Sequence, residues 1–264
     1  MRSQFSAPLI AEGRVYLSPD DVGFTKGSGA AALRLSDGAE LWRFPASSTV
    51  QLASGGLAYL SNPYDGNGEF CAVRAADGTM LWHLPTYGAS VSPDNELAVA
   101  LAVDRGVVYL GGNAAGNAQG GQVHALRARD GKKLWASPTL GDGARSIQVV
   151  SDVIYVSDGG ESMGRGGGGR VSALRVRDGT RIWSVTIGGA SPDLTVADNA
   201  VYASHSVSNI DTASSTVVVL RSGNGARTWS LAAPPEGFYG AAVTVTGHTA
   251  YAYGGDGKLC ALRS

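Results

Sequence analysis

The sequence Ala-Leu-Arg-Leu-Ser-Asp-Gly-Ala-Glu-Leu-Trp, residues 32–42, decides the fold of this chain. Its pattern is a small residue, a glycine six positions later and a tryptophan four positions after that glycine. Four more stretches follow this pattern, and all five tryptophans of the 264-residue chain stand at its last position. The five copies cover residues 32–42, 72–82, 125–135, 173–183 and 219–229.

The joints between copies vary in length, but the motif itself does not. Consecutive tryptophans lie 40 to 53 residues apart, whereas the ten-residue step from the small residue to the tryptophan never changes. A constant motif separated by connecting segments of variable length is typical of a repeat protein, in which insertions fall in loops. A sixth copy starts at Ala261 and stops at Ser264. We therefore expect one repeat architecture along the whole chain.

Each repeat has the composition of four short strands. In the first, residues 8–11, 14–17, 31–35 and 40–44 are apolar or alternate between polar and apolar, as strands do. Asp37-Gly38 forms the tight turn before the last strand. Four antiparallel strands in about 40–50 residues is the size of a propeller blade. A second-strand tyrosine gives six copies in all: Tyr16, Tyr59, Tyr109, Tyr155, Tyr202 and Tyr251.

The small residue–glycine–tryptophan spacing resembles the tryptophan-docking motif of pyrroloquinoline-quinone-like β-propeller repeats. The resemblance covers nearly the whole chain. It implies that the tryptophan on the outermost strand of a blade packs on the small residue and on the glycine turn of the neighbouring blade. The tryptophans that would hold the blades together are Trp42, Trp82, Trp135, Trp183 and Trp229.

The predicted fold is all-β, a single six-bladed β-propeller over residues 1–264 with four-stranded antiparallel blades. The sixth blade lacks its fourth strand, and the N-terminal residues 1–6 are expected to supply it and close the ring. Such a latch would remove two open sheet edges, which otherwise invite aggregation. The expected blades are residues 7–45, 49–85, 97–138, 145–187, 193–233 and 240–264 together with 1–6.

Composition narrows the function classes. The 21 basic and 22 acidic residues give a formal net charge of −1, which argues against a nucleic-acid binder. No apolar run is long enough to insert in a bilayer, and the first residues lack the apolar stretch of a secretory signal. The protein is then either cytosolic or a module excised from a longer protein. The abrupt, already patterned N-terminus favours the second, and we expect a monomeric module of a bacterial membrane-associated or extracytoplasmic protein. Cys71 and Cys260 occupy the same point of two repeats and are expected to be buried thiols.

Few residues of the sequence are candidates for catalysis or for binding a metal or cofactor. Quinone dehydrogenases of the resembled family have eight blades, an adjacent cysteine pair and a calcium site, so we expect no cofactor here. The acidic stretch 65–69 has the spacing of a calcium loop, and the glycine-rich stretch 164–170 that of a phosphate cradle, but each is better interpreted as an exposed connection. The four histidines, His83, His124, His205 and His248, show no pairing typical of a metal site. We expect His83 and His124 to be structural, His205 to open a loop, and no catalytic residue.

An arginine stands two residues after each small residue, where relatives of the resembled family usually carry aspartate. The set is Arg34, Arg74, Arg127, Arg175, Arg221 and Arg263. One interpretation is structural: each guanidinium pairs with a turn aspartate or a backbone carbonyl across a seam between blades. The other is a basic ring that binds an acidic partner.

Long, varied loops are expected at one end of the propeller and short, uniform Asp-Gly turns at the other. The long loops are residues 19–29, 62–69, 86–96, 112–121, 158–170, 206–215 and 234–239. Recognition usually lies in variable loops on a rigid scaffold, and aromatic residues and arginine are the common anchors. The candidate ligand-binding or partner-binding residues are Phe24, Tyr64, Tyr87, Arg145, His205, Phe238 and Tyr239.

The functional hypothesis is a non-catalytic recognition module that binds a protein or a small-molecule ligand through its long-loop face. Relatives of the resembled family occur as assembly-factor scaffolds and as C-terminal domains of bacterial serine/threonine kinases. The resemblance therefore implies an interaction platform or the ligand-sensing domain of a larger receptor kinase. The alternative is a small propeller enzyme, a lyase or hydrolase, acting at the axial mouth.

Overall fold

The computed structural model describes most of the chain in two compact units. One lies within residues 1–97, 103–108 and 126–134, and the other within 98–102, 109–125 and 135–264. The described residues are 8–18, 29–44, 48–62, 69–85, 100–111, 121–140, 143–158, 161–162, 165–166, 168–188, 190–208, 213–232, 242–246, 249–253 and 259–263.

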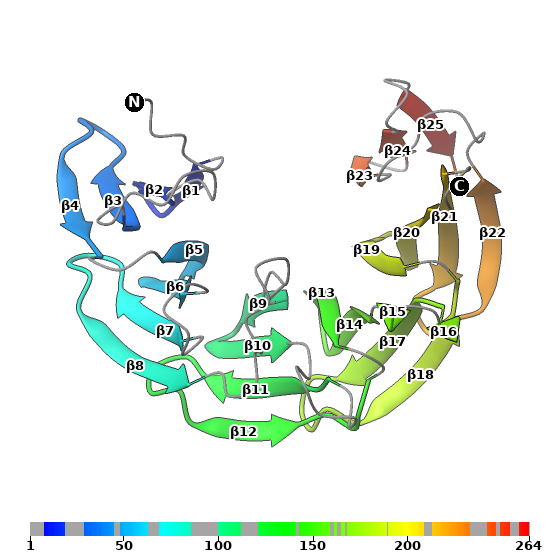
Figure 1. Ribbon diagram of the computed structural model, residues 1–264, viewed down its shortest axis with the longest axis horizontal. Helices are drawn as coiled ribbons and strands as arrows, with labels where there is room; N and C mark the ends of the chain where they lie inside the picture. Colours follow the sequence, from blue (N-terminus) through cyan, green and yellow to red (C-terminus); the bar gives the residue numbers. More distant parts are fainter. Residues whose placement is uncertain are drawn as a thin grey trace. The chain divides into compact units, whose positions relative to one another are not determined.

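The first two repeats form two four-stranded sheets in which sequence neighbours are also spatial neighbours (Figure 1). The first sheet consists of β1 (Leu9–Ala11), β2 (Arg14–Leu17), β3 (Ala31–Arg34) and β4 (Glu40–Arg43). The second consists of β5 (Thr49–Ser54), β6 (Leu57–Asn62), β7 (Glu69–Arg74) and β8 (Met80–Pro85). The expected strands of the first repeat are observed to within one residue.

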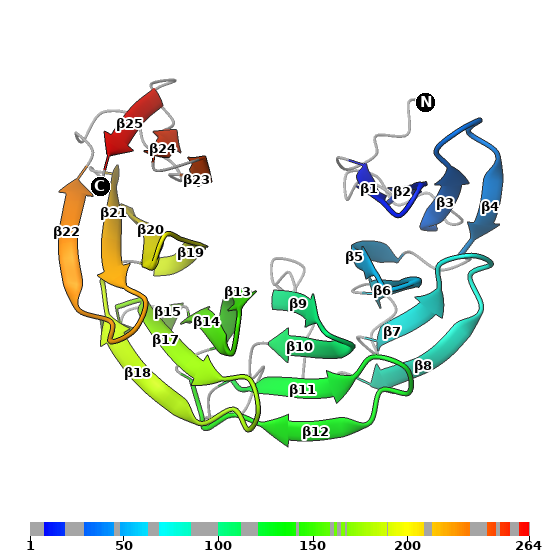
Figure 2. The same cartoon turned by 180° about the vertical axis from the view of Figure 1, so that it is seen from behind.

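The later repeats follow the same order, which Figure 2 shows from behind. The third sheet has β9 (Ala100–Asp104), β10 (Val107–Gly111), β11 (Val123–Arg127) and β12 (Lys133–Ala136). The fourth has β13 (Ala144–Val150), β14 (Val153–Asp158), β17 (Arg170–Arg175) and β18 (Arg181–Thr186). The fifth has β19 (Ala190–Ala197), β20 (Ala200–Ser208), β21 (Ala213–Arg221) and β22 (Arg227–Ala232). The last has β23 (Ala242–Thr246), β24 (Thr249–Tyr253) and β25 (Leu259–Arg263).

The last sheet has three strands among the described residues. The residues expected to complete it, 1–6, lie outside the described part of the chain. The closing latch and the count of six complete blades therefore stay predictions. The described secondary structure is entirely β, and it includes no helix that is long and apolar enough to cross a membrane.

Two expected loops are shorter than the sequence indicated. The connection predicted at residues 158–170 contains a two-stranded sheet of its own, β15 (Glu161–Ser162) paired with β16 (Arg165–Gly166). The loop predicted at 206–215 is mostly strand, because β20 continues to Ser208 and β21 begins at Ala213. Four of the six strand residues in this segment are serines and only Val207 is β-branched, so residue type alone does not indicate the extension.

The turns explain why each hairpin closes where it does. Glu12 and Gly13 join β1 to β2 with positive φ angles of 49° and 72°, as the favoured two-residue hairpin turn requires. At the turn between β3 and β4, Gly38 has a φ of 72° and donates its N–H to the carbonyl of Arg34 at 2.8 Å. Glycine adopts this left-handed conformation at little cost.

A β-bulge precedes the tryptophan in four repeats, a feature that strict two-residue alternation does not predict. Ala32 lies opposite Trp42, but the next residue, Leu33, lies opposite Glu40, so Leu41 is the extra residue. The same shift occurs in the sheets that contain Trp82, Trp183 and Trp229. A bulge re-aims the neighbouring side chains and increases the local twist.

The core lies where consecutive sheets of one unit face each other. Between the first two sheets it contains Tyr16, Trp42, Leu60 and Val73. Between the fourth and fifth sheets it is built from residues such as Tyr155, Val171, Leu194 and Leu220. The small residue of each of the five motifs is also buried, and it lies in the third strand of its sheet: Ala32, Ala72, Ala125, Ala173 and Val219.

Candidate partner-binding surfaces

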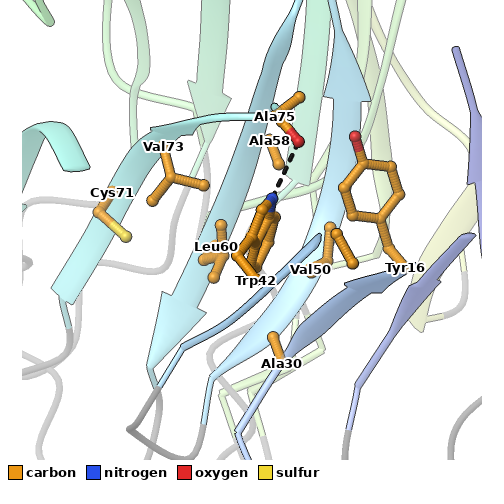
Figure 3. Close-up of a cluster of buried hydrophobic side chains, with 10 residues drawn as sticks. Tyr16, Ala30, Trp42, Val50, Ala58, Leu60, Cys71, Val73 and Ala75 are labelled. Atoms are coloured by element: carbon orange, nitrogen blue, oxygen red, sulfur yellow. Dashed lines mark hydrogen bonds between the residues drawn. The ribbon is translucent and has the colours of Figure 1, made fainter. Parts of the chain in front are cut away.

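The indole of Trp42 joins the first sheet to the second (Figure 3). Its Nε1–H donates a hydrogen bond to the carbonyl of Ala75 at 2.9 Å, and the residue is only 7% exposed. Gly78 lies against the ring so closely that an added Cβ would stand 2.8 Å from Trp42 Cγ. A glycine is therefore required in the turn for steric reasons, in addition to its positive φ.

This contact recurs in the next three repeats, each time within one unit. Trp82, Trp135 and Trp183 donate to the carbonyls of Ala128, Val176 and Ser222 at 2.7, 3.0 and 2.8 Å. An added Cβ on Gly131, Gly179 or Gly225 would fall 2.8 Å or less from the corresponding ring. Trp229 packs beside the buried cluster of Tyr202, Val217, Val219 and Ala250. The indoles are thus engaged in the interior of the protein, and the partner-binding candidates must be sought elsewhere.

Hydrogen bonds from polar side chains add further links between neighbouring sheets. The Glu12 carboxylate accepts the backbone N–H groups of Gly55 and Gly56 at 2.6 and 2.9 Å. The Gln148 amide donates to the carbonyl of Leu194 at 2.7 Å and accepts from the N–H of Val196 at 2.9 Å. Sequence reasoning missed both residues, since neither belongs to the repeated motif. These links make the sheets a rigid support for whatever their loops and turns present.

The Asp-Gly turns carry the arginine set, and three of the arginines pair within their own turn. Nη1 of Arg34, Arg74 and Arg127 lies 2.7, 2.8 and 3.1 Å from Oδ2 of the aspartate three residues later. The predicted pairing with a turn aspartate is therefore correct for these three. The predicted direction, across a seam, is wrong for them, because a guanidinium two residues before the turn reaches the carboxylate of the same hairpin first.

The aspartates also hold the turn backbone. Asp37 accepts the N–H of Ala39 at 3.0 Å, and this bond, followed by Arg34, lowers the pKa of its carboxyl group. At Asp77 the N–H and hydroxyl of Thr79, together with Arg74, lower the pKa to about 2. Both pairs are about half exposed, so each contributes little to stability. The paired turns of the first two hairpins therefore present little uncompensated charge, whereas the third also carries Arg129, Lys132 and Lys133.

The fourth and fifth turns differ from the first three. Asp178 accepts from the Thr180 hydroxyl at 2.6 Å and from Nε of Arg177 at 2.9 Å, rather than from Arg175. In the fifth turn Asn224 replaces the aspartate and still accepts the N–H of Ala226 at 3.0 Å. An amide keeps the turn hydrogen bond but cannot neutralise an arginine. Within the described residues, Arg175 and Arg221 accordingly form no ion pair.

Most of the predicted recognition residues lie outside the described part of the chain: Phe24, Tyr64, Tyr87, Phe238 and Tyr239. Arg145 is in β13, and His205 is in β20, where it lies opposite Thr216. The side chains of Arg145 and His205 are not described. His205 was expected to open a loop, and that prediction is wrong because the hairpin extends three residues beyond it.

The structure adds no support for the calcium-loop, phosphate-cradle and metal-site interpretations among the described residues. The acidic stretch 65–69 is described only at Glu69, in β7. In the stretch 164–170, Gly168 packs on the backbone of Gly188, where an added Cβ would stand 2.9 Å from Cα. No group of three potential metal ligands occurs among the described residues. Cys71 is buried as expected, and His83 lies in β8.

Two buried tyrosines have perturbed hydroxyl groups. Burial raises the pKa of Tyr59 to about 12, and Glu12 contributes in the same direction. Burial also raises the pKa of Tyr16. Neither hydroxyl has a hydrogen-bond partner among the described residues, and both rings tilt against a tryptophan, Trp42 for Tyr16 and Trp82 for Tyr59. Their position in the packed interior indicates a structural role.

The repeated sheets and indole contacts define the class as a pyrroloquinoline-quinone-like β-propeller. Residues 119–264, more than half of the chain, match the family model described as outer membrane protein assembly factor BamB. The chain therefore belongs to the BamB family. The comparison with curated protein sequences gave no significant match.

Solved structures agree on the fold. BamB from Moraxella catarrhalis is similar at 18% identity and a TM-score of 0.67, covering 95% of this chain and 70% of that chain. The computationally designed protein Ika8 is similar at 13% identity and a TM-score of 0.57, covering 100% of this chain and 85% of the design. Quinohemoprotein alcohol dehydrogenase from Comamonas testosteroni is similar at 17% identity and a TM-score of 0.56, covering 86% of this chain and 42% of that chain. At these identities the likeness extends to the fold alone.

Proposed function

We propose that this protein is a non-catalytic protein-interaction module that serves in the assembly of other proteins at a bacterial membrane. Membership in the BamB family is the observation that carries the proposal, because the family is described as an assembly factor for outer membrane proteins. The sheets and their engaged indoles provide a scaffold, and the scaffold presents loops to a partner. A ligand-sensing domain of a larger receptor or kinase is a narrower form of the same hypothesis.

The partner is proposed to bind through the long loops between the second and third strands and between consecutive sheets. These segments vary in length and composition from repeat to repeat, so they can discriminate among partners better than repeated turns can. The aromatic residues Tyr64, Tyr87 and Tyr239 are the proposed anchors, since tyrosine offers a large contact area and a polar hydroxyl group.

The likeness to a quinohemoprotein dehydrogenase does not support an enzyme. It rests on 17% identity and on 42% of the dehydrogenase chain, and a shared fold does not imply a shared activity. An adjacent cysteine pair, which the resembled quinone enzymes possess, is absent from the sequence. Purified protein incubated with pyrroloquinoline quinone and calcium is expected to oxidise no alcohol in a dye-linked assay.

The test is co-purification of tagged protein with membrane proteins of its source bacterium. We expect one or a few stoichiometric partners, and we expect the triple variant Tyr64→Ala, Tyr87→Ala, Tyr239→Ala to lose them at an unchanged melting temperature. The matched control is Leu35→Ala, since Leu35 is 51% exposed beside the first Asp-Gly turn. Retention of the partner by the triple variant would reject the loop surface. Absence of any partner, together with dye reduction, would reject the module in favour of an enzyme.

A further inference from the structure

We propose that the hairpin turns of the fourth and fifth sheets form a second binding surface, specific for an acidic protein segment. This surface is defined as residues 175–181 and 221–227, and it is distinct from the long-loop anchors. It contains five arginines and one aspartate: Arg175, Arg177, Arg181, Arg221, Arg227 and Asp178. The proposal therefore does not depend on where the assembly partner binds.

The two hairpins are neighbours within one unit. Trp183, near the start of β18, donates its indole N–H to the carbonyl of Ser222 at 2.8 Å. Gly225 lies against the same indole, and an added Cβ would also stand 2.9 Å from the Val185 side chain. The fifth turn is thus packed directly on the outer strand of the fourth sheet. The hairpins that carry these arginines are therefore adjacent within this unit.

The charge of this surface is not compensated internally. Arg175, Arg221 and Arg227 are exposed, and none of them forms an ion pair within the described residues. Arg177 pairs with Asp178, and Arg181 donates to the carbonyl of Thr139 at 2.7 Å, which leaves its charge unneutralised. The surface has a formal net charge of +4, whereas residues 74–80 of the second turn carry one arginine and one aspartate and are neutral.

An acidic peptide fits this surface better than a nucleic acid does. Guanidinium groups bind carboxylates through two parallel hydrogen bonds, and two or three arginines suit a short run of aspartate and glutamate. Nucleic-acid binding needs many phosphate contacts and a wide basic field, but the chain has a formal net charge of −1. Asp152 and Asp198 lie in the adjoining turns, whose carbonyl groups bond to Val176 and Ser222. They lower the positive charge around the surface, so the attraction is confined to the arginines, which suits a short acidic segment rather than a long polyanion.

The first turns indicate how the surface can be neutralised without damage to the fold. Where an aspartate stands three residues after the arginine, the two form an ion pair. Asn224 occupies that position in the fifth turn, and residue 223 is a glycine, so no second arginine competes there as Arg177 does at Asp178. The substitution Asn224→Asp should therefore give Arg221 a carboxylate partner within its own turn, while the turn bond to the N–H of Ala226 persists.

The experiment measures binding of a short, fluorescently labelled, glutamate-rich peptide to the full chain by anisotropy at low salt. We expect Arg221→Gln, Arg175→Gln and Asn224→Asp each to weaken binding about two- to fivefold, as expected when one exposed ion pair is lost. The matched controls Arg34→Gln and Arg74→Gln should leave the affinity unchanged, because those arginines are already paired. Binding should also weaken as salt is raised.

Melting temperatures of all variants establish that each is folded, and Asn224→Asp is the variant that best preserves its turn. The proposal is overturned if the peptide does not bind, or if Asn224→Asp binds it as tightly as the original chain. It is also overturned if the Arg34 and Arg74 variants lose as much affinity as the Arg221 variant. Tighter binding of a single-stranded oligonucleotide or of anionic lipid vesicles than of the peptide would assign the surface to those ligands instead.

Discussion

Gly179→Ala offers the sharpest test of how the sheets are held together. Gly179 has a φ of +71°, and an added Cβ would stand 2.5 and 2.6 Å from two ring carbons of Trp135. Gly38 has nearly the same φ, +72°, but an added Cβ there meets no described atom within 4 Å. The two substitutions thus impose the same backbone strain, and only one of them creates a clash with an indole.

The expected magnitudes follow from this comparison. Alanine at positive φ costs about 1–2 kcal/mol, which is the whole effect expected for Gly38→Ala. Gly179→Ala adds the overpacking of a buried aromatic contact, about 1–3 kcal/mol, so its total loss should be about 2–5 kcal/mol. The difference between the two variants isolates the contact between the indole and the turn.

The assay is urea unfolding monitored by tryptophan fluorescence, with circular dichroism as a second probe. Gly179→Ala should unfold at a clearly lower urea concentration than Gly38→Ala. In a Trp135→Ala background the additional penalty of Gly179→Ala should disappear, because the clashing ring is gone. Equal midpoints for the two glycine variants would refute the inference that the turn glycine is selected by the indole.

Three further predictions concern single side chains. Trp135→Ala should lower the unfolding free energy by about 3–5 kcal/mol, and a loss below about 1 kcal/mol in the same urea assay would mean that the indole does not join the sheets. The Asp77 carboxyl has its pKa lowered to about 2, so it contributes stability above about pH 4 that is lost as the pH falls toward 2. Asp77→Asn should show a smaller drop in melting temperature than the original chain between pH 4 and pH 2. An identical drop would contradict the lowered pKa of Asp77. The pKa of Tyr59 is raised from 10.0 to about 12, so the stability that depends on its protonated hydroxyl is fully present below about pH 10 and is lost as the pH rises toward 12. Tyr59→Phe, which also removes an unpaired buried hydroxyl, should keep the neutral-pH stability and resist alkaline unfolding. A destabilisation above about 1 kcal/mol would reveal a missing hydrogen-bond partner.

Most of the fold could be predicted from the sequence, because the same strand-and-turn pattern recurs in every repeat. Tyr16, Ala32 and Trp42 stand at fixed places, and the strands around them were predicted to within about one residue. The bulge before the tryptophan was not predicted, since alternation identifies strands but does not reveal an extra residue within one. The end of β20 was also misjudged, because a serine-rich stretch fits either a strand or a loop.

The candidate surfaces were harder to predict. Pairing of each arginine with a turn aspartate across a seam was proposed from residue types alone. That the partner of Arg34 is Asp37 of the same hairpin depends on backbone geometry that the sequence does not display. The difference at Asn224 was visible in the sequence as a change from the Asp-Gly turn. Its consequence for charge became clear only when the paired turns showed what the aspartate normally neutralises. The long-loop residues stay predictions, because variable loops lack the repetition that made the strands predictable.

The proposed function requires a partner protein in contact with the long loops. Site-specific photo-crosslinking in cells detects such a contact, with a photoreactive amino acid placed at Tyr87 and, as a matched control, at Leu35. We expect a discrete, light-dependent adduct with one protein at Tyr87 and none at Leu35. A folded, well-expressed protein that gives no adduct at Tyr87, nor at Tyr64 or Tyr239, would contradict binding through the long loops.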